Sequence, residues 1–115
     1  MNSSFYIEPL DVSQLQEKEV YFMVDYIDKK LFIPQIRTLV FLGRDVAGKN
    51  DTLLYFQDVE SYVRLGPYPN SANGTGDIFY CTDDQLACFF TLDKAVLALQ
   101  NCVNRRAQNT DSMKL

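Results

Sequence analysis

The sequence predicts a single α+β domain: a mostly antiparallel sheet of about five strands with a short central helix and a C-terminal amphipathic helix. Three observations predict this class. The chain has 115 residues, the size of one domain. Five short segments are rich in β-branched and aromatic residues and are separated by turn residues. Two further segments have apolar residues at helical spacing, and the order β-β-β-α-β-β-α with short connections favours antiparallel pairing.

The five predicted strands are short segments in which Val, Ile, Phe and Tyr are frequent. They are residues 19–27, 31–42, 52–57, 77–82 and 85–90. The first two flank the turn Asp28-Lys29-Lys30, and Pro34 is expected near the start of the second because proline cannot donate to a strand ladder. The last two flank Asp83-Asp84, which predicts a hairpin. Residues 1–15 are expected to lie in an extended form against this body.

Both helices are predicted from capping residues and apolar spacing. Asp58 is the N-cap of a helix over 58–65, and Gly66 follows where a C-terminal glycine is expected. Thr91 precedes the second helix, residues 92–106, which has one apolar stripe with helical period. The stripe is made of Leu92, Ala95, Val96, Leu99, Cys102 and Val103. We assign residues 1–106 to the domain and residues 107–115 to a polar C-terminal tail.

Charge and composition restrict the classes of function. Eleven Lys and Arg against fifteen Asp and Glu give a net charge of −4, and no basic stripe is interleaved with aromatic residues, so no nucleic-acid binding is expected. The N-terminus lacks the pattern of a secretory signal, and no apolar run approaches the ~20 residues of a membrane helix. We therefore expect a cytoplasmic protein that does not enter a membrane, with its three cysteines reduced in the core.

Histidine is absent from the sequence. This removes the commonest general base and the commonest zinc ligand. No other set of catalytic or metal-ligating residue types converges at a readable spacing. We therefore predict no catalytic residues, no metal ligands and no cofactor, and favour a non-catalytic protein over an enzyme.

Residues 70–85, "NSANGTGDIFYCTDDQ", hold the most motif-like stretch of the chain. The Gly74-Thr75-Gly76 triplet has the composition of an anion-binding loop, but such loops precede a helix, whereas this one precedes a predicted strand. No Lys or Arg lies between Arg64 and Lys94 to bind an anion. A phosphate site is therefore not expected here.

The other two features of this stretch are also better explained by turn structure. The Asn73-Gly74-Thr75 triplet matches the glycosylation pattern, which acts only in a secreted chain. Asp77 and Asp83 lie at opposite ends of a strand, roughly 20 Å apart, too far to share a cation. The loop 66–76 is nevertheless long for so small a domain, and whether it closes over a site is left open.

Apolar residues on both faces of several strands are the most informative pattern. In residues 20–27 both alternating sets are apolar except for Asp25, and residues 53–56 have no polar side. A strand with one solvated face alternates apolar and polar residues instead. Two helices can cover one face of five strands but hardly both. The other face must be covered by the N-terminal segment, by a second copy of the chain, or by a partner or ligand.

We therefore predict a non-catalytic protein–protein interaction domain of the small acidic inhibitor, immunity or adaptor type. It would associate with itself through an apolar sheet face, as a homodimer, or bind another protein. Its candidate binding residues are amphipathic or charged: Tyr26, Tyr55, Tyr62, Arg64 and Tyr68. Tyr80 has the same amphipathic character.

The alternative function is that of a small ligand-binding protein or hydrolase with a pocket between sheet and helix. Asp25, Arg37 or Asp58 would then supply the polar groups. An enzyme with a site built across a dimer interface is a third option.

Overall fold

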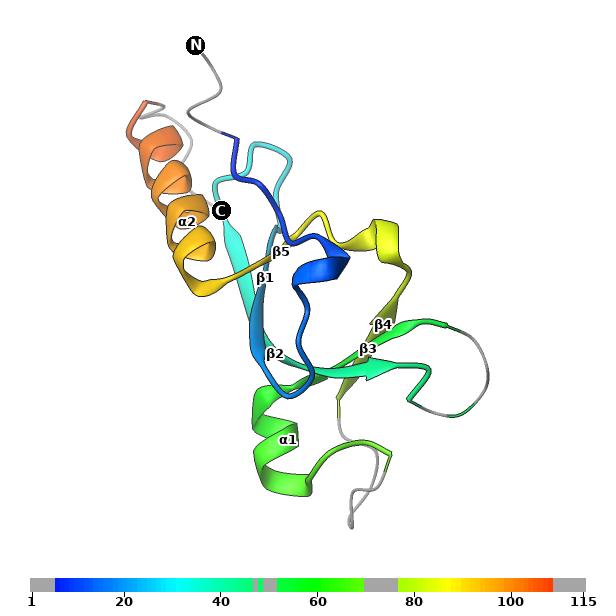
Figure 1. Cartoon of the computed structure of the whole chain (residues 1–115). Coiled ribbons are helices and arrows are strands. Elements are labelled where there is room, and N and C mark those ends of the chain that lie inside the picture. Colours follow the sequence, from blue (N-terminus) through cyan, green and yellow to red (C-terminus); the bar gives the residue numbers. More distant parts are fainter. Residues whose placement is uncertain (1–5, 47, 49–51, 70–76, 109–115) are drawn as a thin grey trace.

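Five antiparallel strands form one sheet, in the order β4-β3-β2-β1-β5, in the computed structural model, which describes residues 6–46, 48, 52–69 and 77–108. The strands are β1 (Val20–Tyr26), β2 (Pro34–Arg44), β3 (Leu54–Asp58), β4 (Ile78–Cys81) and β5 (Phe89–Phe90). Helices α1 (Val59–Leu65) and α2 (Leu92–Ala107) complete the order β-β-β-α-β-β-α (Figure 1). The predicted fold class, the number of strands and the positions of both helices are confirmed.

Helix α1 begins and ends at the predicted residues. The Asp58 carboxylate accepts hydrogen bonds from the backbone N–H groups of Glu60 and Ser61, which have no partner inside the helix. Gly66 ends the helix with φ +89°, and its N–H donates to the carbonyl of Tyr62 at 2.9 Å. Residues 70–76 of the predicted loop 66–76, and residues 109–115 of the predicted tail, lie outside the described residues.

The β1–β2 hairpin is closed by the predicted aspartate. The Asp28 carboxylate accepts hydrogen bonds from the N–H groups of Phe32 at 2.9 Å and Ile33 at 2.8 Å. Desolvation tends to raise the pKa of Asp28, but these backbone hydrogen bonds outweigh it and lower the pKa. Pro34 is the first residue of β2 and pairs with Tyr26, consistent with its predicted place at the strand's start.

One face of the sheet, which we call the core face, is covered by the chain's own irregular segments. The N-terminal segment crosses it, anchored by hydrogen bonds from the N–H of Leu10 to the carbonyl of Phe89 and from the N–H of Lys18 to the carbonyl of Phe41. The buried cluster on this face is Leu10, Tyr21, Leu39, Phe41, Leu54, Phe56, Cys81, Leu86 and Phe89. Covering by the N-terminal segment, one of the three options from the sequence, is therefore realised on this face.

The opposite face, which we call the helix face, carries both helices. Helix α2 packs against β1 and β5, where Ala95 forms a buried cluster with Val24 and Phe90. Helix α1 packs against β2 and β3. Figure 1 shows the two helices at separate places on the sheet rather than side by side.

The predicted hairpin between residues 77–82 and 85–90 is wrong. Strands β4 and β5 lie at opposite edges of the sheet, joined by Thr82, the 3₁₀ turn Asp83–Gln85 and residues 86–88. The crossing segment inserts Leu86 into the core face. Spanning the face in this way buries more apolar surface than a two-residue turn exposed to water would.

Strand β2 bends where its register with β3 shifts, between Phe41 and Gly43. Gly43 has φ +128°, and a Cβ atom there would approach the Glu17 carboxylate to 3.0 Å. The bend turns the far end of β2 away from α2, as Figure 1 shows.

A buried hydrogen-bond network joins β3 to the segments that follow it. The side chain of Gln57 is 0% exposed. Its Nε2 donates to Ser61 Oγ at 3.1 Å and to the Gly66 carbonyl at 3.0 Å, and its Oε1 accepts from the Tyr68 N–H at 3.0 Å. Ser61 Oγ also accepts from the N–H of Asp77, the residue before β4, at 3.1 Å.

Replacing this amide is expected to be costly. In Gln57→Leu the carbonyl of Gly66 and the N–H of Tyr68 lose their partner, and we expect the free energy of unfolding to fall by about 2–4 kcal/mol. Urea unfolding followed by circular dichroism measures this. Val63→Ala changes a side chain on α1 that is 79% exposed, and should move stability by no more than about 0.5 kcal/mol. Equal effects of the two substitutions would contradict the role given to the network.

Candidate interaction surfaces

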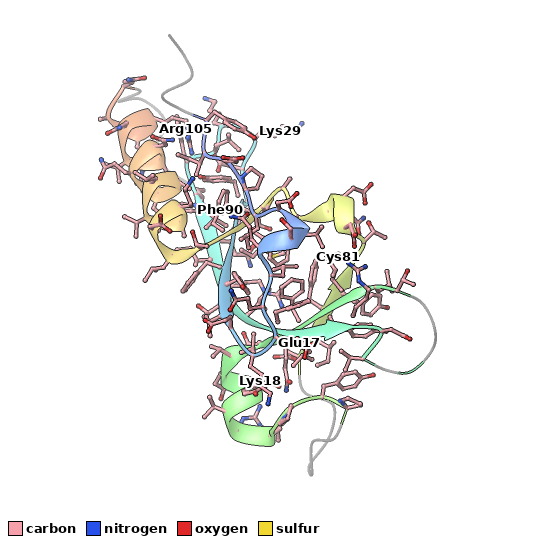
Figure 2. All side chains as sticks on the ribbon, in the orientation of Figure 1. Glu17, Lys18, Lys29, Cys81, Phe90 and Arg105 are labelled. Carbon is pink, nitrogen blue, oxygen red and sulfur yellow. The ribbon has the colours of Figure 1, made fainter. Side chains whose placement is uncertain are left out.

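The predicted binding residues do not form one site. Tyr26 lies on β1, where the Arg105 guanidinium stands 5.2 Å from the centre of its ring. Figure 2 shows Arg105 at the same end of the molecule as Lys29, in the β1–β2 turn. Tyr62 and Arg64 lie on α1 instead, and Arg64 forms an exposed ion pair with Glu60 at 3.3 Å. Exposed pairs of this kind contribute little to stability.

Two of the predicted residues lie together, joined by a third tyrosine. The rings of Tyr55 and Tyr68 are stacked, with centroids 6.3 Å apart and an interplanar angle of 15°. Tyr80, directly opposite Tyr55 in the β3–β4 register, has its ring centroid 5.6 Å from that of Tyr55. Tyr55 is buried, whereas Tyr80 is 59% exposed. We call these three residues the tyrosine cluster. Residue type identified its members in the sequence, but only strand register brings them together.

The polar groups considered for a pocket do not converge. Asp25 and Arg37 lie on the core face, opposite Gln35 and Met23, and Asp58 is used to cap α1. The Oδ1 atom of Asp25 is buried without a hydrogen-bond partner among the described residues.

A hollow of about 180 Å³ lies between sheet and helix and is lined by residues that include Tyr26, Phe90, Ala98 and Arg105. It is smaller than the ~300–1,000 Å³ usual for ligand pockets. In the part of the chain that the structure describes, no group of three or more Cys, Asp or Glu side chains could hold a metal ion.

Helix α2 has one flank that nothing in the described part of the chain covers. Its buried side is made of Ala95, Ala98 and Cys102. On one flank Lys94 and Asn101 line hollows shared with the N-terminal segment, which runs along β5. The opposite flank therefore faces β2 and consists of Leu92, Val96, Leu99 and Val103, which repeat at intervals of three and four residues. Leu99 packs against the Val24 cluster.

The neighbouring part of the sheet is apolar as well. Ile36 lies directly opposite Val24, and Val20 lies on the same face because it precedes Phe22 by two residues and Val24 by four. Together these side chains form what we call the helix–sheet surface, and each is between 37% and 60% exposed. The helix–sheet surface consists of Val20, Ile36, Leu92, Val96 and Val103.

The outer edge of β4 is a second feature that no described strand covers. The N–H of Asp58 donates to the carbonyl of Asp77 at 2.9 Å, so these two residues form a hydrogen-bonded pair. In an antiparallel ladder such pairs alternate with pairs that do not bond each other. Phe79 and Cys81 therefore bond to β3, whereas Ile78 and Tyr80 direct their N–H and C=O groups to the open side.

The three cysteines are free thiols, and two of them are buried. Figure 2 shows Cys81 at the end of β4 beside the Asp83–Gln85 turn. Burial, followed by the nearby negative charges of Asp83 and Asp84, raises the pKa of the Cys81 thiol from 9.0 to about 11. Cys102 Sγ lies 3.5 Å from the carbonyl oxygens of Leu31 and Phe32. The predicted core positions of Cys81 and Cys102 are confirmed, whereas Cys88, also predicted to lie in the core, is only half-buried.

Comparison with known proteins identifies no relative. No family model, no curated protein and no solved structure matches the chain. Among the described residues, no helix is both long and apolar enough to cross a membrane.

The raised pKa of Cys81 predicts a loss of stability in alkali. The unfolded chain releases the thiol proton near pH 9 and the folded protein only near pH 11, so the stabilising contribution present below pH 9 is lost as the pH rises between them. Urea unfolding at a series of pH values measures this loss. Between pH 9 and pH 11 the free energy of unfolding should fall less steeply in Cys81→Ala than in the natural sequence. Parallel curves for the two proteins would show that Cys81 does not titrate in this way.

Proposed function

We propose that this chain is a non-catalytic protein–protein interaction domain that associates with itself through the helix–sheet surface. The observation that supports this proposal is the grouping of five exposed apolar side chains along one helix flank and the adjoining sheet. Single exposed apolar residues are common on monomers, whereas contiguous patches mark binding surfaces.

The charges on α2 favour a second copy as the partner. Asp93 lies in the first turn of this helix and Arg106 in the last. A two-fold axis perpendicular to α2 would place the α2 helices of the two copies antiparallel. The acidic start of each helix would then lie near the basic end of the other. The two helix dipoles would then be antiparallel, which is the favourable arrangement for neighbouring helices. A two-fold interface uses the same patch on both copies, so one apolar flank is sufficient.

A cytoplasmic location is part of this proposal. Three free cysteines in so small a chain are typical of proteins in a reducing compartment. The net charge of −4 fits the small acidic inhibitor or adaptor type.

The alternative, a small ligand-binding protein or hydrolase, has one feature in its favour. The hollow beside Tyr26 contains a cation, Arg105, and opens between sheet and helix as expected for a ligand pocket. Arg105 is already engaged, however, because its guanidinium donates to the carbonyl of Leu31 at 2.8 Å. Asp25 and Asp58 lie elsewhere, so the interaction domain is the better supported function.

Sedimentation or light scattering tests the proposal. We expect a dimer at micromolar concentrations, and we expect Val96→Glu to weaken the dimer at least about tenfold, because a charge would be buried at the interface. Val96 is more than half exposed in the single chain, so the fold should survive, as circular dichroism can verify.

The matched control is Val63→Glu, which makes the same change on an exposed position of α1, outside the helix–sheet surface. It should leave the dimer unchanged. A clean monomer across micromolar concentrations, or equal loss of the dimer in both variants, would overturn the proposal.

A further inference from the structure

Strand β4 leaves hydrogen-bonding groups available on one side. It is the last strand of the sheet, and within the described ranges no strand pairs with its outer edge. Ile78 and Tyr80 together present two N–H donors and two carbonyl acceptors there, as the alternation of the ladder requires. An added strand would pair with all four groups.

Within residues 6–46, 48, 52–69 and 77–108, β4 lacks the usual protections of an edge strand. Natural edges are blunted by Lys, by Pro, by a bulge or by a covering segment. The sequence of Ile78–Cys81 is Ile-Phe-Tyr-Cys, without a charge or a proline, and its register with β3 is continuous. As far as the described residues show, its shortness is the one protective property of β4.

The side chains at this edge suit recognition. Tyr80 is 59% exposed and is supported from behind by the buried ring of Tyr55, which in turn stacks on Tyr68. A supported tyrosine loses little conformational freedom on binding and offers both an apolar ring and a hydroxyl group. A side chain on an added strand would lie directly beside Tyr80.

The charge around the edge is negative at both ends. Asp77 stands before β4, and Asp83 and Asp84 follow it. Arg44 pairs with Asp83 at 2.8 Å, which leaves Asp77 and Asp84 without a cation among the described side chains. The end of β4 that leads into the Asp83–Gln85 turn also borders an open hollow of about 330 Å³. Its lining includes Arg44, Asp83 and Asp84.

From these observations we propose that the outer edge of β4 binds an extended segment of a partner protein, as a sixth strand, and that this segment carries Lys or Arg at both ends of an uncharged centre. The centre pairs with Ile78 and Tyr80, and the terminal cations meet Asp77 at one end and Asp84 at the other. This inference goes beyond the proposed self-association and uses a different surface.

A second copy of this chain fits the edge less well. Antiparallel self-pairing that joins all four backbone groups places Phe79 on the two-fold axis, with Ile78 opposite Tyr80 of the copy. Asp77 would then lie opposite Cys81 of the copy, close to the acidic turn that follows it. Each end of the interface would gather carboxylates from both chains, which repel each other. A basic partner removes this repulsion.

The test uses a fluorescein-labelled peptide, Lys-Arg-Val-Thr-Val-Thr-Val-Lys-Arg, and the full chain. We expect saturable binding by fluorescence anisotropy, with amide chemical-shift changes centred on Ile78 and Tyr80 in NMR spectra. A peptide of the same centre with Glu and Asp at its ends serves as the matched control and should bind more weakly. Added salt should weaken binding of the basic peptide.

Two proline variants test the strand pairing itself. The N–H groups of Ile78 and Tyr80 point outward, so Ile78→Pro and Tyr80→Pro should keep the bonds to β3 while removing a donor from the edge. We expect each to weaken peptide binding at least about tenfold. Ile78→Val and Tyr80→Val keep the donor and are the matched controls. Circular dichroism verifies the fold of each variant. If Ile78→Pro does not fold, peptide binding by Tyr80→Pro tests the strand pairing.

A charge reversal tests the choice of partner. Asp77→Lys should weaken binding of the basic peptide roughly two- to fivefold and strengthen binding of the acidic one. The control is Glu8→Lys, which makes the same change of net charge on the N-terminal segment, beside α2. It should leave the binding of both peptides unchanged.

Three outcomes would overturn the proposal. The first is no binding of the basic peptide up to about 1 mM, or equal binding of the acidic one. The second is binding that the proline variants leave unchanged. The third is a dimer of the natural sequence that Ile78→Pro converts to monomer, which would show that a second copy occupies this edge. Failure of the proposed self-association is distinguishable, because Val96→Glu would then leave the oligomeric state unchanged while peptide binding persists.

Discussion

The buried amide of Gln57 holds together the half of the domain that contains the β4 edge. Its nitrogen donates to Ser61 and to the Gly66 carbonyl, and Ser61 accepts in turn from the N–H of Asp77. A buried polar group left without its partner costs more than a surface hydrogen bond contributes, so these bonds act as a unit. Helix α1, the turn after it and the start of β4 are therefore fixed relative to β3. Once Asp77 is held opposite Asp58, the register that places Tyr80 against Tyr55 follows.

The two faces of the sheet differ because the irregular segments that the structure describes close only one of them. On the core face, the N-terminal segment and the crossing from β4 to β5 pack around Phe56. The ring centroids of Phe56 and Phe89 are 4.7 Å apart. On the helix face, α2 presents Ala95 and Ala98, and such small side chains let a helix approach a sheet closely. Close approach over β1 and β5 leaves the part of β2 next to α2 uncovered by any described residue, whereas α1 packs on another part of β2. The exposed flank is thus a consequence of how α2 is seated, and the proposed dimer would cover it.

Local signals predicted the fold well, and long-range pairing is where sequence reasoning failed. Asp58 and Gly66 mark the ends of α1 because capping depends on neighbouring residues alone. Asp83-Asp84 fits a hairpin turn and the start of a 3₁₀ turn equally well, and the choice depends on Leu86 reaching a core that the local sequence does not reveal. The interaction surfaces have the same limitation. Tyrosines are recognisable by type, but only the β3–β4 register shows that Tyr80 stands at an open edge.

The two edges of the sheet provide an internal comparison for the proposed docking site. At the β5 edge, the N–H of Leu10 bonds to the carbonyl of Phe89, so the N-terminal segment covers the strand. The chain therefore protects one edge with a device that natural sheets commonly use. At the other edge, β4 has neither a charge nor a proline, and an exposed tyrosine stands on it. An unprotected edge carries a risk of aggregation, which a charge or a proline on the strand would reduce. Its retention beside carboxylates that repel a second copy is understandable if a basic strand from another protein pairs with it.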